Sequence, residues 1–425
     1  MTRRREAAVA RVLTPILPSR SGERGVHLLS LIASQWFLLG QPAGPVGYTE
    51  AAFVGGLAAA FVPAAAAAGL GAWQASRLCR AGIDQWTSRR PPQRVFAGAL
   101  SRIIAIEWLV LVVGPVWRML ADGGGTPRPV AVLMVGASAA VVAGAAFVGC
   151  VLGSVLPAVI APAVAVAVVY LWMVLPYGFE PLWLRHLAGD PSGCCLSSTE
   201  LSPRGVVAPL LVGLGLVGAA MVAVDWRSRP WPRRSTAGAI MVAAVVSAGV
   251  VAAPLPADPV QPRSTGLRCG GAAGPGAGRI CLWGEHEPRR SEVERVVSDV
   301  RRRFGAIGVT LPVRVTEEDI AAGAWPITVP DDRSPGQLRR SVATGLVPQD
   351  SRCDPGLQAG AALGTLDVLV PYVLLVAGAR PRAEEFVEGA LARAEAEAAN
   401  PPVEQARWLT AQLTALADCR PLPIR

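Results

Sequence analysis

The sequence predicts a mainly α-helical protein, a polytopic transmembrane bundle of about seven helices followed by a small α/β or α+β domain outside the cytoplasm. Three observations lead to this fold class. Of the 425 residues, 52% are hydrophobic and 17% are charged, and the mean hydropathy of +0.41 is too high for a soluble protein of this length. Apolar runs of membrane-spanning length recur up to residue 255. Charges of both signs at helical spacing appear after residue 290.

The apolar runs define the expected transmembrane helices, because a hydrocarbon core about 30 Å thick needs roughly 20 apolar residues per helix. The candidates are His27–Val46, Ala51–Leu70, Ser101–Leu120, Pro129–Cys150, Leu156–Tyr177, Val206–Val224 and Thr236–Leu255. The first is the weakest, because its solid apolar run ends near Gly40 and prolines follow. A buried or re-entrant helix is the alternative for that segment.

The distribution of arginine predicts the orientation, since cytoplasmic loops of membrane proteins carry an excess of positive charge. The chain contains no lysine. The arginines before the first span are Arg3, Arg4, Arg5, Arg11, Arg20 and Arg24, and those of the loop at residues 72–100 are Arg77, Arg80, Arg89, Arg90 and Arg94. The expected outside connections at residues 47–50 and 122–128 contain only Arg128. We therefore expect a multi-pass protein of the cell membrane with its N-terminus in the cytoplasm and its C-terminal domain outside.

The same pattern divides the chain into four parts. Residues 1–25 are expected to be a cytoplasmic amphipathic segment, residues 26–255 the transmembrane domain, residues 256–268 a linker, and residues 269–425 the extracytoplasmic domain. In that domain Ser291–Phe304 has the valine stripe of an amphipathic helix, and Ser291 with Glu294 resembles a capping box. The apolar segment at residues 357–379 fits either an eighth span or a buried core helix, and its polar interruptions favour the core helix.

The eight cysteines are sorted by the predicted topology. Cys79 and Cys150 lie in a cytoplasmic loop and at a membrane end, whereas the other six are expected outside, where disulfides form. Six cysteines allow 15 pairings. We expect Cys269 to pair with Cys281, and Cys353 with Cys419. The adjacent Cys194 and Cys195 either stay reduced, bridge elsewhere or bond to each other.

Several chemistries are excluded or unsupported. Without lysine there is no Walker A loop, no kinase strand lysine and no Schiff base for pyridoxal phosphate. The stretch around His286 lacks the second histidine of a zincin motif, because Arg290 stands at that position. We therefore expect no enzymatic activity in this chain, no cofactor and no metal. The arginines separate apolar segments and do not form one basic face with aromatics, so nucleic-acid binding is not expected.

Glu107 is the one acidic residue well inside a predicted span. Carboxylates at membrane depth usually face the interior of a bundle or a substrate pathway, so Glu107 is the candidate functional residue. The alternative is a group near the interface that pairs with Arg102 or is simply protonated.

The layout of residues 1–225 resembles the permease subunit of an ABC exporter of the second type. The features that carry the resemblance are the N-terminal segment Thr2–Pro18, the long basic loop between the second and third spans, and the larger outside loop between the fifth and sixth. In that family two copies of the permease form the pathway and the basic loop docks on a separate ATPase. The resemblance implies a docking loop around Gly82–Arg94. Its candidate contact residues are Arg80, Arg89, Arg90 and Arg94.

A second resemblance concerns the C-terminal part. The stretches Cys281–Glu287 and Glu404–Trp408 look like the outer domain of uncharacterised actinobacterial membrane proteins, a domain with no assigned function. We therefore expect a homodimeric permease of an ABC-type export system that works with a separate P-loop ATPase. The alternative is a membrane-anchored sensor or ligand-binding protein whose extracytoplasmic domain captures a ligand.

Overall fold

The structure, a computed structural model, describes residues 20–41, 47–81, 92–121, 126–189, 191, 194–223, 230–256, 258–263, 266–271, 278–317, 324–330, 335–347 and 363–417. The contacts divide the chain into two compact units, Met1–Arg263 and Ser264–Arg425. Each unit is described by itself.

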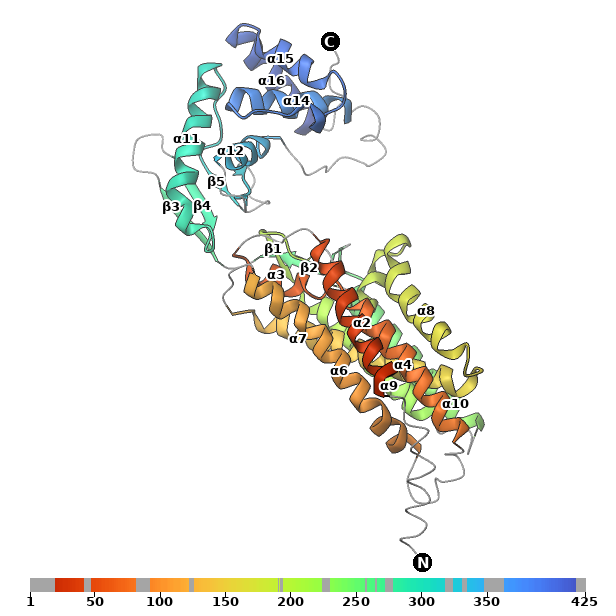
Figure 1. The fold of residues 1–425 in the computed structure, drawn as a ribbon. Helices are drawn as coiled ribbons and strands as arrows, with labels where there is room; N and C mark the ends of the chain where they lie inside the picture. Colours follow the sequence, from red (N-terminus) through yellow and green to blue (C-terminus); the bar gives the residue numbers. More distant parts are fainter. Residues whose placement is uncertain are drawn as a thin grey trace, which may run out of the picture. The chain divides into compact units, whose positions relative to one another are not determined.

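The first unit is a bundle of helices that run side by side (Figure 1). Its helices are α2 (Arg20–Leu39), α3 (Thr49–Gly55), α4 (Phe61–Arg80), α6 (Pro92–Ala121), α7 (Pro129–Val155), α8 (Ala161–Val174), α9 (Pro203–Ala223) and α10 (Pro230–Ala252). Five segments of the described residues are long and apolar enough to cross a membrane: Gln93–Ala121, Pro129–Val155, Ala161–Gly178, Pro203–Ala223 and Ser235–Ala252. These correspond to the last five predicted spans. Helices α2 and α4, which overlap the first two predicted spans, are not among these five segments.

The predicted second span, Ala51–Leu70, is not one helix. Helix α3 ends at Gly55, turns follow over residues 56–60, and α4 begins at Phe61 and continues to Arg80. The break lies where the chain presses against α6: a Cβ atom at Gly56 would lie 2.3 Å from the backbone nitrogen of Pro115. Pro63 falls in the first turn of α4, where a missing N–H is tolerated.

Helix α4 forms the centre of the bundle and packs most extensively on α7. The two backbones meet at small residues, since a Cβ atom at Gly149 would lie 1.9 Å from the carbonyl oxygen of Ala68. Such close packing of small side chains is typical of helices that associate in lipid.

Helix α2 has its polar side inward and its apolar side outward. Its buried residues are Glu23, His27, Ser30, Ser34 and Leu38, and its exposed large apolar residues are Val26, Leu28, Leu29, Ile32, Trp36 and Leu39. Leu29 and Trp36 are 66% and 76% exposed. A helix on the surface of a water-soluble protein has the reverse pattern, so the outer face of α2 suits lipid.

The connection between α8 and α9 contains two short 3-10 helices, η1 (Leu175–Gly178) and η2 (Leu182–Ala188), and the strand β1 (Thr199–Leu201). Strand β1 pairs antiparallel with β2 (Val260–Pro262). The range 256–268, expected to be a linker, thus contains the strand β2, which belongs to the bundle unit.

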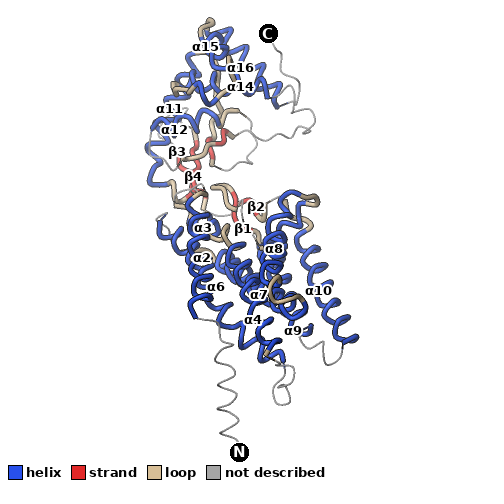
Figure 2. Tube along the Cα trace, turned by 45° about the vertical axis from the view of Figure 1, so that its right-hand side comes forward, coloured by secondary structure: helices blue, strands red, loops and turns tan. Residues whose placement is uncertain are grey.

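The second unit is a four-stranded sheet with helices (Figure 2). The strands, in spatial order, are β3 (Leu267–Gly271), β4 (Arg279–Trp283), β5 (Val315–Thr316) and β6 (Trp325–Pro326). Strand β3 is antiparallel to β4, whereas β4, β5 and β6 are parallel. The helices are η3 (Glu287–Arg289), α11 (Arg290–Ala306), α12 (Pro335–Thr344), α14 (Leu363–Ala377), η5 (Ala383–Glu385), α15 (Ala390–Ala398) and α16 (Pro402–Ala417).

The core of this unit confirms the valine stripe of α11 and corrects its start. Val293, Val297 and Val300 are fully buried in the core. The expected capping box at Ser291 is wrong, because η3 runs directly into α11, which begins at Arg290 without a side-chain cap. Helix α14 has 15 residues and lies in the same core, in agreement with the core-helix interpretation of residues 357–379.

Candidate functional site

Glu107, the candidate from the sequence, is the central residue of the apolar span Gln93–Ala121 and is 0% exposed. It lies on α6 and contacts α2. The Oε1 atom of Glu107 lies 2.6 Å from Nδ1 of His27, and the hydroxyl of Ser30 donates a hydrogen bond of 2.8 Å to Oε2. A carboxylate, an imidazole and a hydroxyl therefore form one buried cluster, which we call the α2–α6 cluster (His27, Ser30 and Glu107).

The pairing of Glu107 with Arg102, one of the alternatives from the sequence, is not the contact that Arg102 makes. The guanidinium Nε of Arg102 instead lies 3.8 Å from Oε1 of Glu23, one turn of α2 before His27. The same Glu23 oxygen lies 3.8 Å from Nε2 of His27, an atom for which the described residues offer no hydrogen-bond partner. Arg102 is 58% exposed at its side chain and Glu23 is 12% exposed, so this end of the cluster approaches the surface of the bundle.

The polar row of α2 continues beyond the cluster. The Ser34 hydroxyl donates to the backbone oxygen of Ser30 at 2.8 Å. Beside it lies a cavity of about 10 Å³, roughly the space of one water molecule. Its lining includes Ser34, Gln35, Leu38, Gly56 and Gly114. The buried polar atoms of α2 thus reach from Glu23 to the break between α3 and α4.

This arrangement can hold and exchange a proton. An ionised carboxylate without a partner costs several kcal/mol in a low-dielectric interior, whereas a carboxylate beside an imidazolium forms a neutral pair. Chains of acidic and imidazole groups at membrane depth commonly mark proton or ion pathways. The cluster offers no obvious chemistry for bond cleavage, and among the described residues no three histidine, cysteine or acidic side chains are grouped as a metal site.

Sequence reasoning found Glu107 but missed its partners. Glu23, His27, Ser30 and Ser34 follow one another at intervals of three and four residues in an otherwise apolar helix, which places them on one face. That spacing was the available signal. It does not say which helix the face contacts, and Glu107 lies 80 residues from His27 along the chain.

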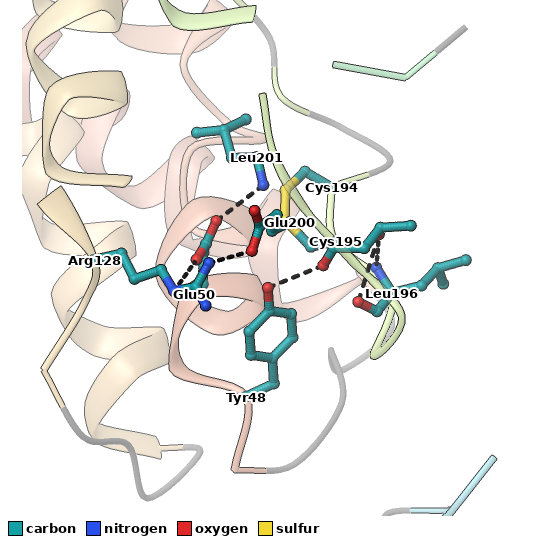
Figure 3. The surroundings of a disulfide bond; sticks show 9 residues. Tyr48, Glu50, Arg128, Cys194, Cys195, Leu196, Glu200 and Leu201 are labelled. Carbon is teal, nitrogen blue, oxygen red and sulfur yellow. Dashed lines mark hydrogen bonds and ion pairs between the residues drawn. A yellow bond between two sulfur atoms is a disulfide. The ribbon is translucent and has the colours of Figure 1, made fainter. Parts of the chain in front are cut away.

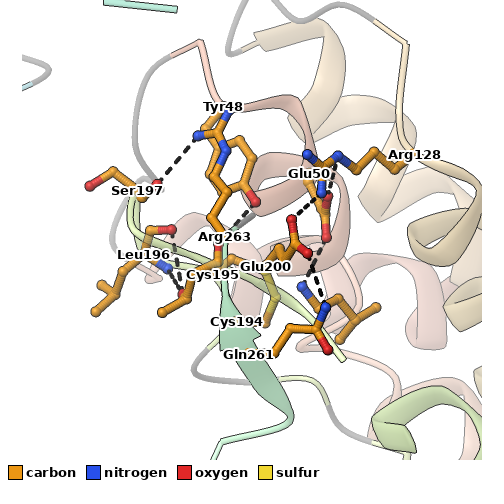
Figure 4. A network of polar contacts seen from close by, with 12 residues as sticks. Tyr48, Glu50, Arg128, Cys194, Cys195, Leu196, Ser197, Glu200, Gln261 and Arg263 are labelled. Carbon is orange, nitrogen blue, oxygen red and sulfur yellow. Dashed lines mark hydrogen bonds and ion pairs between the residues drawn. A yellow bond between two sulfur atoms is a disulfide. The ribbon is translucent and has the colours of Figure 1, made fainter. Parts of the chain in front are cut away.

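A second polar network lies at the other end of the bundle (Figures 3 and 4). The Arg128 guanidinium pairs with Glu200 and lies 3.5 Å from Oε2 of Glu50. Glu50 also accepts a hydrogen bond of 2.9 Å from the backbone N–H of Leu201, and Gln261 donates to Glu200 at 3.0 Å. The network thus ties α3 and α7 to β1 and β2. It also gives Arg128, the one arginine of the predicted outside connections at residues 47–50 and 122–128, two compensating carboxylates; the predicted outside loop at residues 178–205 contains Arg185 and Arg204.

Tyr48 and the adjacent cysteines complete this network. The Tyr48 hydroxyl donates to the backbone oxygen of Thr199 at 2.9 Å, and the Arg263 guanidinium stacks 4.3 Å from the centre of the Tyr48 ring. Burial, and then the nearby Glu50 charge, raise the pKa of Tyr48 well above its ordinary value, so the hydroxyl remains a donor. Cys194 and Cys195 are buried beside it and bonded to each other (Figure 3).

The remaining sequence candidates are scattered. Arg80 ends α4 and its Nε donates to the backbone oxygen of Ser76 at 3.3 Å, while Arg94 is exposed near the start of α6. Arg89 and Arg90 lie outside the described residues, as do Cys353 and Cys419. Cys269 and Cys281 are joined by a disulfide between β3 and β4, the pairing expected from the sequence.

The second unit contains another buried histidine–glutamate pair. Nδ1 of His286 lies 2.6 Å from Oε1 of Glu317. The other oxygen of Glu317 accepts a hydrogen bond of 2.7 Å from the backbone N–H of Trp283, and Val329 N–H lies 3.3 Å from Oε1. Glu317 therefore joins the carboxyl ends of β4 and β5 to the residues that follow β6, an arrangement that fits a structural cross-link.

Comparison with known proteins adds a likeness for the second unit alone. Residues 280–419 match the model of a family described as a domain of unknown function (DUF7224). The matched region contains the core of the second unit and both His286 and Glu317. None of the curated proteins and none of the solved structures compared with the chain matches it.

Proposed function

We propose that the chain is the membrane, or permease, subunit of an ABC-type export system that works with a separate ATPase. The observation that carries the proposal is the α2–α6 cluster, a fully buried carboxylate at the centre of an apolar span whose partner helix exposes apolar residues outward. Replacing a buried ion pair by apolar residues is often neutral or stabilising, so the need for stability alone does not explain such a pair. A role in moving a substrate, or in the conformational change that accompanies it, does.

The order of the elements supports the choice of an exporter permease. Helices α2 to α9 are compatible with the layout of the resembled family, and the long connection between α8 and α9 stands where that family has its larger outside loop. The basic loop between α4 and α6 corresponds to the ATPase-docking loop. The lysine-free chain cannot supply a Walker A motif, so ATP hydrolysis belongs to another protein. Two copies of the chain form the assembly in this proposal.

The proposed orientation places the N-terminus and the loop between α4 and α6 in the cytoplasm and the second unit outside. Arginine in the short loops supports it. The disulfide between Cys269 and Cys281 supports an oxidising environment for the second unit.

Co-purification tests the proposal. The chain is expressed in its native host with an affinity tag, and P-loop ATPases recovered with it from detergent extract are identified by mass spectrometry. The double variant Arg89→Ala/Arg90→Ala is expected to reduce recovery of the ATPase by at least about tenfold, because it removes two charges from the docking loop. The matched control, Arg227→Ala/Arg229→Ala, changes the next predicted cytoplasmic loop and leaves recovery unchanged. Equal recovery from all three proteins removes the docking loop from the proposal.

The second candidate is a membrane-anchored sensor or ligand-binding protein. It is favoured by the second unit, which has its own hydrophobic core and its own disulfide. The segment 264–425, produced in an oxidising compartment, then folds alone and the bundle requires no ATPase. A folded segment together with a bundle that recovers no ATPase selects this candidate over the exporter.

A further inference from the structure

We propose that the α2–α6 cluster is a proton-binding site that holds one exchangeable proton and is reached from the end of the bundle that carries Glu23 and Arg102. The inference requires no ATPase and no particular exported substrate. It goes beyond the proposed function because it assigns a ligand, a proton, to residues of the membrane unit.

The first step in the argument is the charge balance of the buried pair. With a proton on each ring nitrogen, His27 is an imidazolium beside the Glu107 carboxylate, and the pair has no net charge. Loss of the proton at Nε2 leaves a neutral ring that still donates from Nδ1, and the pair then carries one buried negative charge. Because Glu107 is fully buried, the state with a net charge has the larger desolvation cost.

The second step is the position of the atom that accepts the proton. Nε2 of His27 is buried and has no hydrogen-bond partner among the residues that the structure describes, while Nδ1 is occupied by Glu107. Oε1 of Glu23 lies 3.8 Å from Nε2. A proton delivered to Nε2 therefore forms an N–H bond directed toward a second carboxylate, and water or a buffer acid at the bundle surface supplies it.

The third step concerns the other charges around the cluster. Helix α2 packs on α4 and α6. Arg102 on α6 lies near Glu23, and Arg77 on α4 interacts electrostatically with Glu23. Both cations face Glu23 at the rim, and the apolar helix α7, which also packs on α6, contains no charged residue. Among the described residues, His27 is therefore the group that can balance the charge of Glu107.

The fourth step is the limited extent of the polar row. Beyond Ser30 it continues to Ser34 and to a cavity with room for about one water molecule. Leu38 is buried at the end of the row, and Gly56 and Gly114 bring the backbones together there. The row thus runs from Glu23, near the surface of the bundle, to the buried Leu38, whose backbone oxygen accepts a hydrogen bond of 2.6 Å from Arg118.

Titration of the histidine rings tests the proposal on the full chain in lipid nanodiscs. The chain has three histidines, so [¹⁵N]histidine labelling gives ring-nitrogen signals from three rings. The signals that disappear in His27→Gln are those of His27. We expect the wild-type His27 ring to take up one proton, and Glu107→Gln to lower its proton affinity by at least about tenfold, because the adjacent negative charge is lost. His186→Gln, which changes another buried histidine of the same unit, leaves the His27 titration unchanged.

A milder variant keeps the test decisive if Glu107→Gln fails to fold. Ser30→Ala removes the hydroxyl that stabilises the carboxylate, so the cluster is expected to bind its proton several-fold more tightly. Glu107→Asp, which retains the charge, preserves uptake. A His27 ring that keeps one protonation state from pH 5 to pH 9, or that titrates identically in wild type, Glu107→Gln and Ser30→Ala, overturns the proposal and leaves a purely structural pair.

Discussion

The two units of this protein each bury a histidine–glutamate pair with the same contact, Nδ1 to Oε1 at 2.6 Å, yet the surroundings differ. Glu317 in the second unit accepts hydrogen bonds from two backbone N–H groups as well as from His286. Glu107 in the bundle accepts them only from side chains, His27 and Ser30, among the described residues. The two backbone donors fix Glu317 between strands, which fits a cross-link, whereas the pair in the bundle has no such backbone donor among the described residues and is the site that we propose to be exchangeable.

The largest effect is expected from breaking the cross-link. Glu317→Gln removes a charged acceptor from two backbone donors and one imidazole, and each lost charged hydrogen bond costs roughly 1.5–3 kcal/mol. We expect the second unit to lose at least about 3 kcal/mol of stability. Hydrogen exchange at β4 and β6 in the full chain measures the loss. Glu404→Gln, on the exposed side of α16, is the control and should leave exchange unchanged; equal protection in both variants contradicts the cross-link.

The disulfide between Cys269 and Cys281 lies in the unit that contains His286 and Glu317 and not in the bundle. Removing it should therefore affect only one of the two histidine–glutamate pairs. Cys269→Ser/Cys281→Ser opens a link of sequence separation 12 between β3 and β4, the strand that ends at Trp283. The loop-closure entropy of such a link corresponds to about 2–3 kcal/mol. Urea unfolding of the full chain, followed by exchange at both units, should show destabilisation around Glu317 and none around Glu107. A comparable loss in the bundle would mean that the two units are coupled.

In the bundle, His27 and Glu107 should each require the other, whereas replacing both by apolar side chains should be tolerated. Glu107→Leu leaves Nδ1 of His27 without an acceptor in the bundle and is expected to cost about 2 kcal/mol. The double variant His27→Leu/Glu107→Leu replaces both groups by apolar side chains and should lie within about 1 kcal/mol of the wild type. Thermal unfolding of detergent-solubilised protein measures both. The single variant His27→Leu completes the cycle: a double variant as unstable as the sum of the two single variants would show that His27 and Glu107 are not coupled and would contradict this dependence.

The smallest effect is expected at the third histidine, which contacts a backbone oxygen. His186 Nε2 lies 2.9 Å from the backbone oxygen of Pro256, and its buried Nδ1 has no hydrogen-bond partner within the described part of the chain. Burial lowers the pKa of His186 below its ordinary value. The folded protein therefore favours the neutral ring, and this part of its stability is present above the unfolded pKa, about 6.5, and is lost as pH falls below it.

Thermal midpoints at pH 8 and pH 5 for wild type and His186→Gln measure this dependence. We expect the thermal midpoint of the wild type to fall between pH 8 and pH 5, and that of His186→Gln to fall slightly less. A variant with a steeper decrease than the wild type would reverse the assigned sign.

Local sequence properties predicted much of the architecture. The apolar runs located the five membrane-length helices, and the valines at Val293, Val297 and Val300 identified the buried face of α11, because both signals depend on residues within one helix. The predicted start of α11 and the predicted second span were wrong because both depend on contacts with other elements of the fold. The start of α11 is fixed by η3, which directly precedes it, and by Arg290, whose guanidinium donates to the backbone oxygen of Ile280 in β4. The break after Gly55 depends on contact with α6.

The candidate site shows the same division. By itself the sequence determined that a carboxylate, Glu107, stands in the middle of an apolar segment, that no lysine is available, and that Cys269 and Cys281 fall in the same C-terminal part. Only the tertiary structure decided that Glu107 meets His27, that Arg102 meets Glu23, and that the polar face of α2 points inward. The physical reason is that hydrophobic length and charge are properties of one segment, whereas the partner of a buried charge depends on which helices pack together and at what register.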